Sequence, residues 1–337
     1  MTLLANTNPM PSLFRRLADF GFDRPYVHKV ALPDWWDESV AEADDGYAQT
    51  LMLLSRNLGL DMSSLQNADA PLQCRGIGAT CYKMKQSVTE DDLRQAHCIA
   101  ARAAQLACYA TSIPTVVLPQ SAIEIRATIG KGENRAVDFG MLLDYCWDMG
   151  VPVLHVNRFP KNARKMDGMA ARIKGRPVIV LSKNNRYSAW LLFLLAHELG
   201  HIVSKHVDET GIVLDEKVDR ASVDEMEIAA NTFAVELLTG KPDAAYWAPG
   251  NLTAQELVNW AQRASARDRV DPGVVALNYA WNKGHWAVGQ SALGIIEPNG
   301  DAVAAIRARM CARLDWGRLP VESRRFLSHV TGAEDPT

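Results

Sequence analysis

A glutamate and two histidines near the middle of the sequence have the types and spacing of a metal-dependent hydrolase. His197, Glu198 and His201 form a His-Glu-x-x-His pattern directly after an apolar run, Leu191–Ala196. On a helix the two histidines are four residues apart, so both imidazoles project from one face and can hold one zinc ion. Glu198 then lies beside the metal, where a carboxylate can deprotonate a zinc-bound water. The pattern predicts zinc-dependent hydrolysis; the alternative is a buried helix with two hydrogen-bonded histidines.

A catalytic zinc needs a third protein ligand, which must come from elsewhere in the chain. The extended pattern with a third histidine fails, because neither its glycine nor that histidine is present. A second helix is predicted to begin at the capping box Ser222-x-x-Glu225. Small residues flank Glu227 at helical spacing and allow close approach to the zinc helix, while Asn231 can support the ligands from behind. We therefore expect Glu227 as the third ligand; a surface or salt-bridge role is the alternative.

The two motifs together resemble the ImmA/IrrE family of zinc metallo-endopeptidases. That family has HExxH followed by E-x-x-A-N-x-F-A-x-x-L-L, and here His197–His201 is followed by Glu227–Leu238. The likeness also takes in apolar segments at 150–156 and 177–181, so it covers about residues 115–245. The chain departs at 238–240, where Leu-Thr-Gly replaces the Leu-Met-Pro of many relatives.

The resemblance implies a specific activity and a class of substrate. Family members typically cleave a helix-turn-helix repressor encoded beside them, which releases a stress or mobile-element response. The implied zinc ligands are His197, His201 and Glu227, with Glu198 as general base. The implied partner is therefore a helix-turn-helix repressor or a toxin–antitoxin partner.

Peptide cleavage also needs a surface that binds the substrate and a hydrogen-bond donor for the oxyanion. An extended substrate is expected to pair with a sheet edge beside the zinc helix, and Pro177–Leu181 is the predicted strand. Candidates for the oxyanion donor are Tyr187, His155 and His206, and the sequence does not choose among them. An ordinary structural role is the alternative for each.

The six cysteines include no CxxC pair, which is typical of a reduced protein rather than a disulfide framework. Cys74 and Cys81 lie in a glycine-rich loop near basic residues. Either thiolate could occupy the open position of the zinc and inhibit the enzyme. A structural zinc site that adds His97 and Cys98, or plain reduced thiols, are the alternatives.

Composition excludes several classes of protein. The chain has 337 residues, a formal net charge of −3 and 48% hydrophobic residues, which suits two or three folded domains and excludes a disordered chain. The small net charge argues against attraction of the whole protein to nucleic acid or to an anionic membrane. The longest apolar stretch, Ala189–Ala196, is far too short to span a bilayer, and the first residues do not resemble a signal peptide. We expect a soluble cytoplasmic protein.

The predicted fold is α+β and mostly helical. It has a zincin-like core with a small three-stranded sheet against the HExxH helix, and helical N- and C-terminal regions. Helices are expected at 12–20, 35–65, 90–110, from about 119 or 121, and at 137–149; strands are expected at 151–156, 169–173 and 177–181, the last two joined by a turn at Lys174-Gly175. The expected domains are a helix-turn-helix-like module (1–69), a linker and helix (70–114), the peptidase core (115–245) and a helical C-terminal region (246–337).

Charge is distributed unevenly over these regions. Residues 1–69 carry ten acidic and five basic side chains, and the second helix of the helix-turn-helix-like unit, 61–66 after Gly59, has no Arg or Lys. DNA reading needs a basic surface, so packing or partner binding is the preferred interpretation. Six arginines between 307 and 325 make the end of the chain basic. They predict a solvated helix face, or else a docking site for an acidic partner or nucleic acid.

Two functions are therefore carried forward. The first is a zinc-dependent endopeptidase that cleaves one specific protein partner. The alternative is a regulatory or antitoxin-like binding module, which retains the peptidase fold and acts by binding a protein partner or DNA.

Overall fold

The computed structural model describes residues 9–75, 80–83, 90–130, 136–161, 163–164, 166–207, 211–215 and 224–334. Its helices are α1 (Met10–Phe20), α2 (Arg24–Val30), α3 (Asp44–Leu58), α4 (Met62–Gln66), α5 (Glu90–Ala110), α6 (Ala122–Ile129), α7 (Phe139–Asp148), α8 (Ser188–Val203), α9 (Glu225–Thr239), α10 (Ala254–Asp268), α11 (Pro272–Lys283), α12 (Trp286–Ile296), α13 (Ala302–Arg313) and α14 (Val321–Thr331), with short 3₁₀ helices η1 (Glu38–Glu42) and η2 (Trp316–Arg318). The strands are β1 (Thr80–Lys83), β2 (Val153–His155), β3 (Gly168–Ile173), β4 (Arg176–Leu181) and β5 (Ile212–Asp215). The α+β class and the helical majority are confirmed.

The sheet is larger than the sequence predicted. The three expected strands are present as β2, β3 and β4, but the described residues form a five-stranded sheet in the order β1-β5-β3-β4-β2. Both additional strands have four residues and pair in parallel with each other, and β5 also pairs antiparallel with β3. Four-residue strands between polar segments carry too little hydrophobic periodicity to be distinguished from loops.

The predicted hairpin turn is confirmed. Lys174 and Gly175 join β3 to β4 and have φ values of 51° and 81°. Two successive positive φ angles are typical of the tight turn that matches the twist of antiparallel strands.

The prediction that Pro177–Leu181 is an edge strand is wrong. This segment belongs to β4, which pairs antiparallel with β3 on one side and parallel with β2 on the other. Among the described residues the edges of the sheet are β1 and β2. The backbone groups of β4 are thus used within the sheet, so a substrate cannot add to it.

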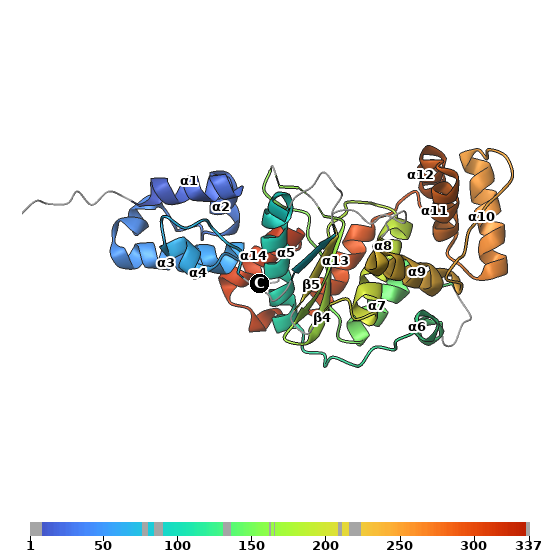
Figure 1. Ribbon diagram of the computed structural model, residues 1–337, viewed down its shortest axis with the longest axis horizontal. Coiled ribbons are helices and arrows are strands. Elements are labelled where there is room, and N and C mark those ends of the chain that lie inside the picture. The colour runs from blue at the N-terminus through green and yellow to red at the C-terminus, as the bar shows by residue number, and fades with distance from the viewer. Residues whose placement is uncertain are drawn as a thin grey trace, which may run out of the picture.

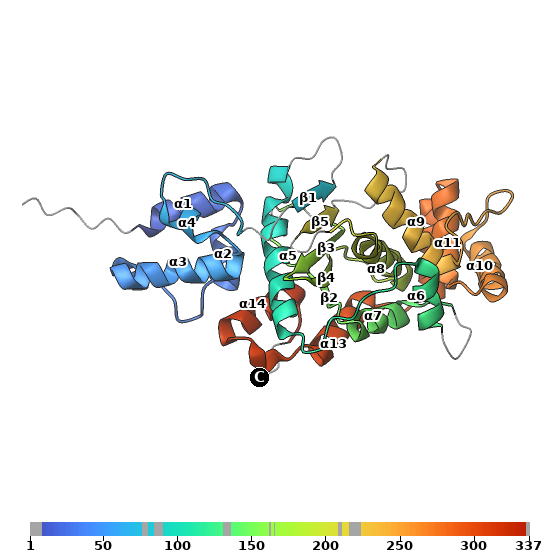
Figure 2. The same cartoon turned by 60° about the horizontal axis from the view of Figure 1, so that its bottom comes forward.

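Helices cover both faces of the sheet, and alternate strand residues enter two separate cores. Val153, Ala170 and Ile179 face the core that contains α8, whereas Leu154, Met169 and Val178 face the core that contains α5. Figure 2 shows α5 and α8 on opposite sides of the sheet. Burial on both faces explains why β4 is apolar almost throughout instead of alternating.

The N-terminal helices pack on the α5 side (Figure 1). The helix expected over 35–65 is divided into η1, α3 and α4. Helix α2 was not predicted. Its N-cap is Asp23, which accepts a hydrogen bond from the Tyr26 amide. Gly59 separates α3 from α4 with a φ of 68°, as the helix-turn-helix interpretation requires. The Arg16 side chain donates to the backbone carbonyls of Ser64 and Asn67 around the end of α4. These contacts agree with a packing role for α4; the domain boundaries remain a prediction.

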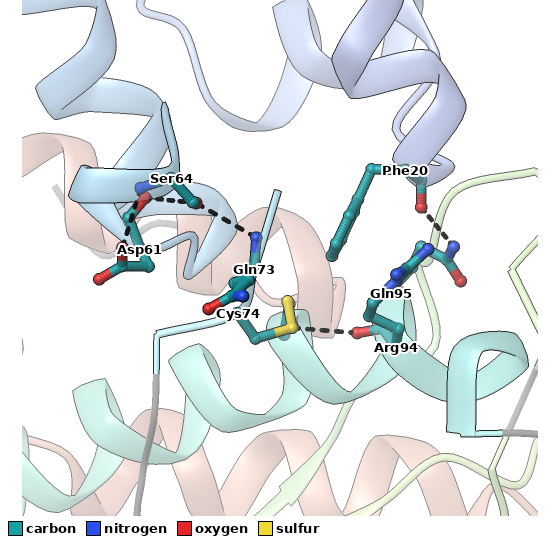
Figure 3. Close-up of a disulfide and its surroundings, with 8 residues drawn as sticks. Phe20, Asp61, Ser64, Gln73, Cys74, Arg94 and Gln95 are labelled. Atoms are coloured by element: carbon teal, nitrogen blue, oxygen red, sulfur yellow. Dashed lines mark hydrogen bonds between the residues drawn. A yellow bond between two sulfur atoms is a disulfide. The ribbon is translucent and has the colours of Figure 1, made fainter. Parts of the chain in front are cut away.

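A disulfide joins this module to α5 and corrects the expectation of reduced cysteines. Cys74 is bonded to Cys98, with their Cα atoms 5.5 Å apart. Figure 3 shows Cys74 against α5, where its Sγ lies 3.4 Å from the Arg94 carbonyl oxygen. The chain also approaches α5 closely at Gly59. A methyl group there would lie only 2.8 Å from the Cys98 carbonyl oxygen. Cys74 is therefore not a free inhibitory thiol; the side chain of Cys81 lies outside the described residues.

The C-terminal region, from residue 246 to the last described residue, 334, is helical, as predicted. Helices α10, α11 and α12 pack together and α11 reaches α8, while α13 covers β2 and α14 packs on α2, α3 and α5. Thr253 and Glu256 form a capping box at the start of α10. No helix in the described part of the chain has the length and apolar character to cross a bilayer.

Candidate metal centre

Close packing of α8 and α9 places the candidate ligands opposite one another. A methyl group at Gly200 of α8 would lie 3.2 Å from both the Cα and the carbonyl oxygen of Ala230 in α9, so the two backbones are nearly in contact. Helix α9 begins at Glu225, two residues later than a cap at Ser222 would place it, and its N-cap is Asp224, which accepts from the Met226 and Glu227 amides. The expected cap, Ser222, lies outside the described residues.

Three buried side chains from these helices meet and could hold a metal ion. His197 Nε2 and His201 Nε2 are 3.1 Å apart. Glu227 Oε1 lies 3.3 Å from His201 Nε2, and Glu227 Oε2 lies 3.6 Å from His197 Nε2. Tetrahedral bonds of about 2.0–2.2 Å separate ligand atoms by about 3.3–3.6 Å. The two carboxylate–imidazole distances lie in this range and the imidazole–imidazole distance is slightly shorter, so the set is close in size to a four-coordinate zinc site. Its donors, two nitrogens and a carboxylate, are also of the type zinc takes.

The hydrogen-bond partners of the two histidines suit this purpose. The Asn231 Oδ1 atom lies 3.2 Å from His197 Nδ1, and because an amide oxygen can only accept, Nδ1 carries the proton and Nε2 presents a lone pair. The other histidine has an imidazole partner, since His201 Nδ1 and His206 Nδ1 are 2.9 Å apart. Contacts of this kind orient metal-binding histidines. The sequence predicted the supporting place of Asn231, but not the contact of His206, which a five-residue spacing alone does not indicate.

Glu198 lies next to this group and against the first residue of β3. Its side chain is fully buried, as are those of His197 and His201. A methyl group at Gly168 would lie 2.6 Å from Glu198 Cδ and 3.1 Å from Cγ, well inside an ordinary contact. The absence of a side chain at Gly168 therefore makes room for the carboxylate. Nothing in the sequence around Gly168 indicated this role.

The remaining candidate oxyanion donors are not brought to the group. Tyr187 is the N-cap of α8 and its hydroxyl packs near Gly294 of α12; ten residues of helix separate it from His197 by about 15 Å. His155 ends β2 and its Nε2 lies 3.1 Å from the Lys183 carbonyl oxygen. Burial lowers the pKa of His155 below its usual value, which favours the neutral ring. Of the three, His206 alone contacts a candidate ligand.

Comparison with known protein families agrees with this geometry. A peptidase family described as the IrrE N-terminal-like domain matches residues 150–267. Residues 150–267 are called the IrrE-like segment below. The IrrE-like segment holds all four residues of the group and strands β2 to β5, and the match supports a metallopeptidase-type domain there.

The IrrE-like segment begins and ends later than the 115–245 expected from the resemblance. It omits α6 and α7 and includes all but the last residue of α10, which the sequence interpretation placed in the C-terminal region. No curated protein and no solved structure matches the chain.

Proposed function

We propose that the chain is a zinc-dependent endopeptidase that cleaves a specific protein, a helix-turn-helix repressor or antitoxin. The observation that carries this proposal is the convergence of two imidazole Nε2 atoms and the Glu227 carboxylate beside the buried Glu198. The match to the IrrE-like peptidase family supports it independently.

The roles of the residues follow from their positions. His197, His201 and Glu227 would hold the zinc ion, which supplies Lewis acidity to activate water and to polarise the peptide carbonyl. Glu198, adjacent to this group, accepts the proton of the attacking water on a carboxylate oxygen and delivers it to the departing amine. Asn231 and His206 keep the imidazoles in position. An extended substrate would have to use an edge strand of the sheet, because β4 is already paired on both sides.

The first experiment measures metal in matched variants of the purified full chain. Wild type is expected to bind about one equivalent of zinc and Glu227→Gln less than half, because a carboxylate ligand is lost. Glu225→Gln is the matched control, since Glu225 is exposed on the same helix two residues earlier. Less than half an equivalent in reconstituted wild type, or equal zinc in Glu227→Gln, would refute the ligand assignment.

The second experiment mixes wild type and Glu198→Gln with the protein encoded beside this one. Removal of a general base lowers the rate by about 10²–10⁴-fold, so cleavage is expected from wild type and not from the variant, with equal zinc in both. Equal cleavage by both proteins would exclude Glu198 as the base.

A second function is favoured by one observation. His197, Glu198 and His201 have no exposed surface in the structure. Such burial is expected of a metal site that stabilises a fold and is not reached by a substrate. A regulatory module would then act by gripping a protein partner or DNA through its helical ends. Stable complex formation by wild type and Glu198→Gln alike, without cleavage, would support this alternative.

A further inference from the structure

A basic cavity lies on the α5 side of the sheet, away from α8. It has a volume of about 840 Å³ and is walled by α5, by the β3–β4 turn, and by η2 with the start of α14. Its cationic lining residues are Arg56, Arg102, Lys174, Arg176 and Arg318. No Asp or Glu lines it within the described part of the chain. A cavity whose charged lining side chains are all cationic has a positive potential that attracts anions.

A smaller cavity extends this region toward the N-terminal helices. It has a volume of about 380 Å³, shares Arg56 and Arg102 with the larger cavity, and adds Arg75. The Arg75 side chain donates to the Ser55 hydroxyl, and its charge also acts on the Asp61 carboxylate, which does not line this cavity. The concentration of positive charge therefore continues beyond the first cavity.

These cations differ from the neighbouring arginines of the C-terminal region. Arg309 and Arg313 pair with Asp144 and Asp148 of α7. By contrast, no carboxylate pairs with Arg102 or Arg318 among the residues that the structure describes. Arg325 pairs with Asp34, so three of the six arginines in the basic C-terminal region have carboxylate partners, whereas Arg318 faces the cavity.

Arg102 is the most constrained of the cavity cations. Its Nη1 and Nη2 atoms have only distant neutral acceptors, Gln105 Oε1 at 3.4 Å and Ser323 Oγ at 3.5 Å, and its buried Nε has no hydrogen bond. Burial, followed by the charges of Arg75 and Arg56, lowers the pKa of Arg102 to about 10. A guanidinium presents five N–H donors in a fixed fork that matches phosphate oxygens. The site has donors in place for an anion that would relieve this repulsion.

An aromatic ring lies at the other end of the same helix face. Tyr109 follows Arg102 by seven residues on α5, so the two share a face and lie about 10 Å apart along the axis. The Tyr109 side chain is 56% exposed and lines the cavity. The Arg318 guanidinium carbon lies 5.1 Å from the centre of its ring. Exposed aromatic rings and arginine planes are surfaces on which nucleobases stack.

We propose that this cavity binds a nucleotide, with its phosphates on Arg56 and Arg102 and its base on Tyr109. A nucleotide carries anionic and aromatic groups at opposite ends, and the cavity presents cationic side chains at one end and an aromatic ring at the other. The cavity volume lies within the roughly 300–1,000 Å³ of small-molecule pockets, and its concave form favours a small ligand over a nucleic acid strand. The site is separate from the metal group, which lies across the sheet.

Calorimetric titration of the full chain tests the proposal without any need for peptidase activity. The probes are ATP, GTP, AMP, inorganic pyrophosphate and a double-stranded DNA. At least one nucleotide is expected to bind more tightly than pyrophosphate. Loss of a charged hydrogen bond to phosphate is expected to weaken nucleotide binding about tenfold or more in Arg102→Gln and in the exposed double variant Arg56→Gln/Arg318→Gln. Arg263→Gln on α10 removes the same charge from an exposed position far along the chain and should bind as wild type does.

Tyr109→Leu separates the two halves of the site. It should weaken nucleotide binding and leave pyrophosphate binding unchanged, because only the base contact is removed. The proposal is overturned if no nucleotide binds at about 1 mM, if the cavity variants bind as Arg263→Gln does, or if nucleotides bind no better than pyrophosphate. Binding of DNA without binding of any nucleotide would also overturn it and would indicate a nucleic-acid surface. Circular dichroism of each variant shows whether a loss of binding comes from a loss of fold.

Discussion

The contact between Gly168 and Glu198 allows the proposed catalytic base to be displaced by a substitution at Gly168, while Glu198 itself stays a glutamate. In Gly168→Ala the new methyl carbon would lie 2.6 Å from Glu198 Cδ and closer still to Oε1, whereas real contacts remain beyond 3.0 Å. The φ angle of Gly168 is not positive, so the backbone tolerates alanine. The carboxylate must therefore move by about 1 Å, and a displacement of this size costs about 100-fold in rate when a reacting group leaves its productive geometry.

The assay compares single-turnover cleavage of the protein substrate with zinc content in the same preparations. Gly168→Ala is expected to bind zinc as wild type does, because Glu198 is not a ligand in our proposal, and to cleave about 100-fold more slowly. Gly140→Ala is the matched control, since its methyl would meet the flexible end of the Arg309 side chain at 3.1 Å and Asp138 Oδ1 at an ordinary 3.4 Å. Cleavage within twofold of wild type would refute the reasoning, and loss of zinc would show that the change disrupts the fold instead.

Three further predictions concern the shell of the site and the stability of the fold. Replacing Asn231 by Ala should weaken zinc binding about 10–100-fold, measured by competition with a chelating dye, because His197 loses the acceptor that orients its ring; unchanged affinity would contradict this. Burial lowers the pKa of His97 to about 4, so the unfolded chain binds a proton that the folded chain does not between about pH 6.5 and 4. The free energy of unfolding should fall by at most about 3 kcal/mol as the pH is lowered from about 6.5 to 4. Urea unfolding of His97→Gln at the same pH values should not show this part of the decrease. The disulfide between Cys74 and Cys98 closes a loop with a sequence separation of 24, so the double serine variant should be about 3 kcal/mol less stable than the oxidised protein, and no less stable than the reduced one.

The parts of the structure that were predictable are those set by local periodicity. The four-residue spacing of His197 and His201 places them on one helix face, and the spacing of small residues on the next helix singles out Glu227. Likewise, the two apolar runs around Lys174-Gly175 indicate a hairpin without any tertiary information. These features depend only on backbone geometry within a few residues.

The features that were missed depend on contacts between distant segments. Cys74 and Cys98 pair only because α5 crosses the end of the N-terminal module, and the spacing of cysteines says nothing of that. Strand β4 is interior because the short β2 lies on its far side. The cavity gathers side chains from position 56 to position 323, so no stretch of sequence could show it.

The position of α14 has a consequence for the order in which the protein matures on the ribosome. This helix contributes Phe326, Leu327 and Val330 to the same core as α1–α5. The apolar faces of the first helices to be made thus stay partly uncovered until residues 321–331 have left the exit tunnel. During that interval they present the surface that chaperones bind and that drives aggregation. Nascent chains arrested before residue 321 should therefore be retained by such chaperones, and chains that carry residues 321–331 and have left the ribosome should not.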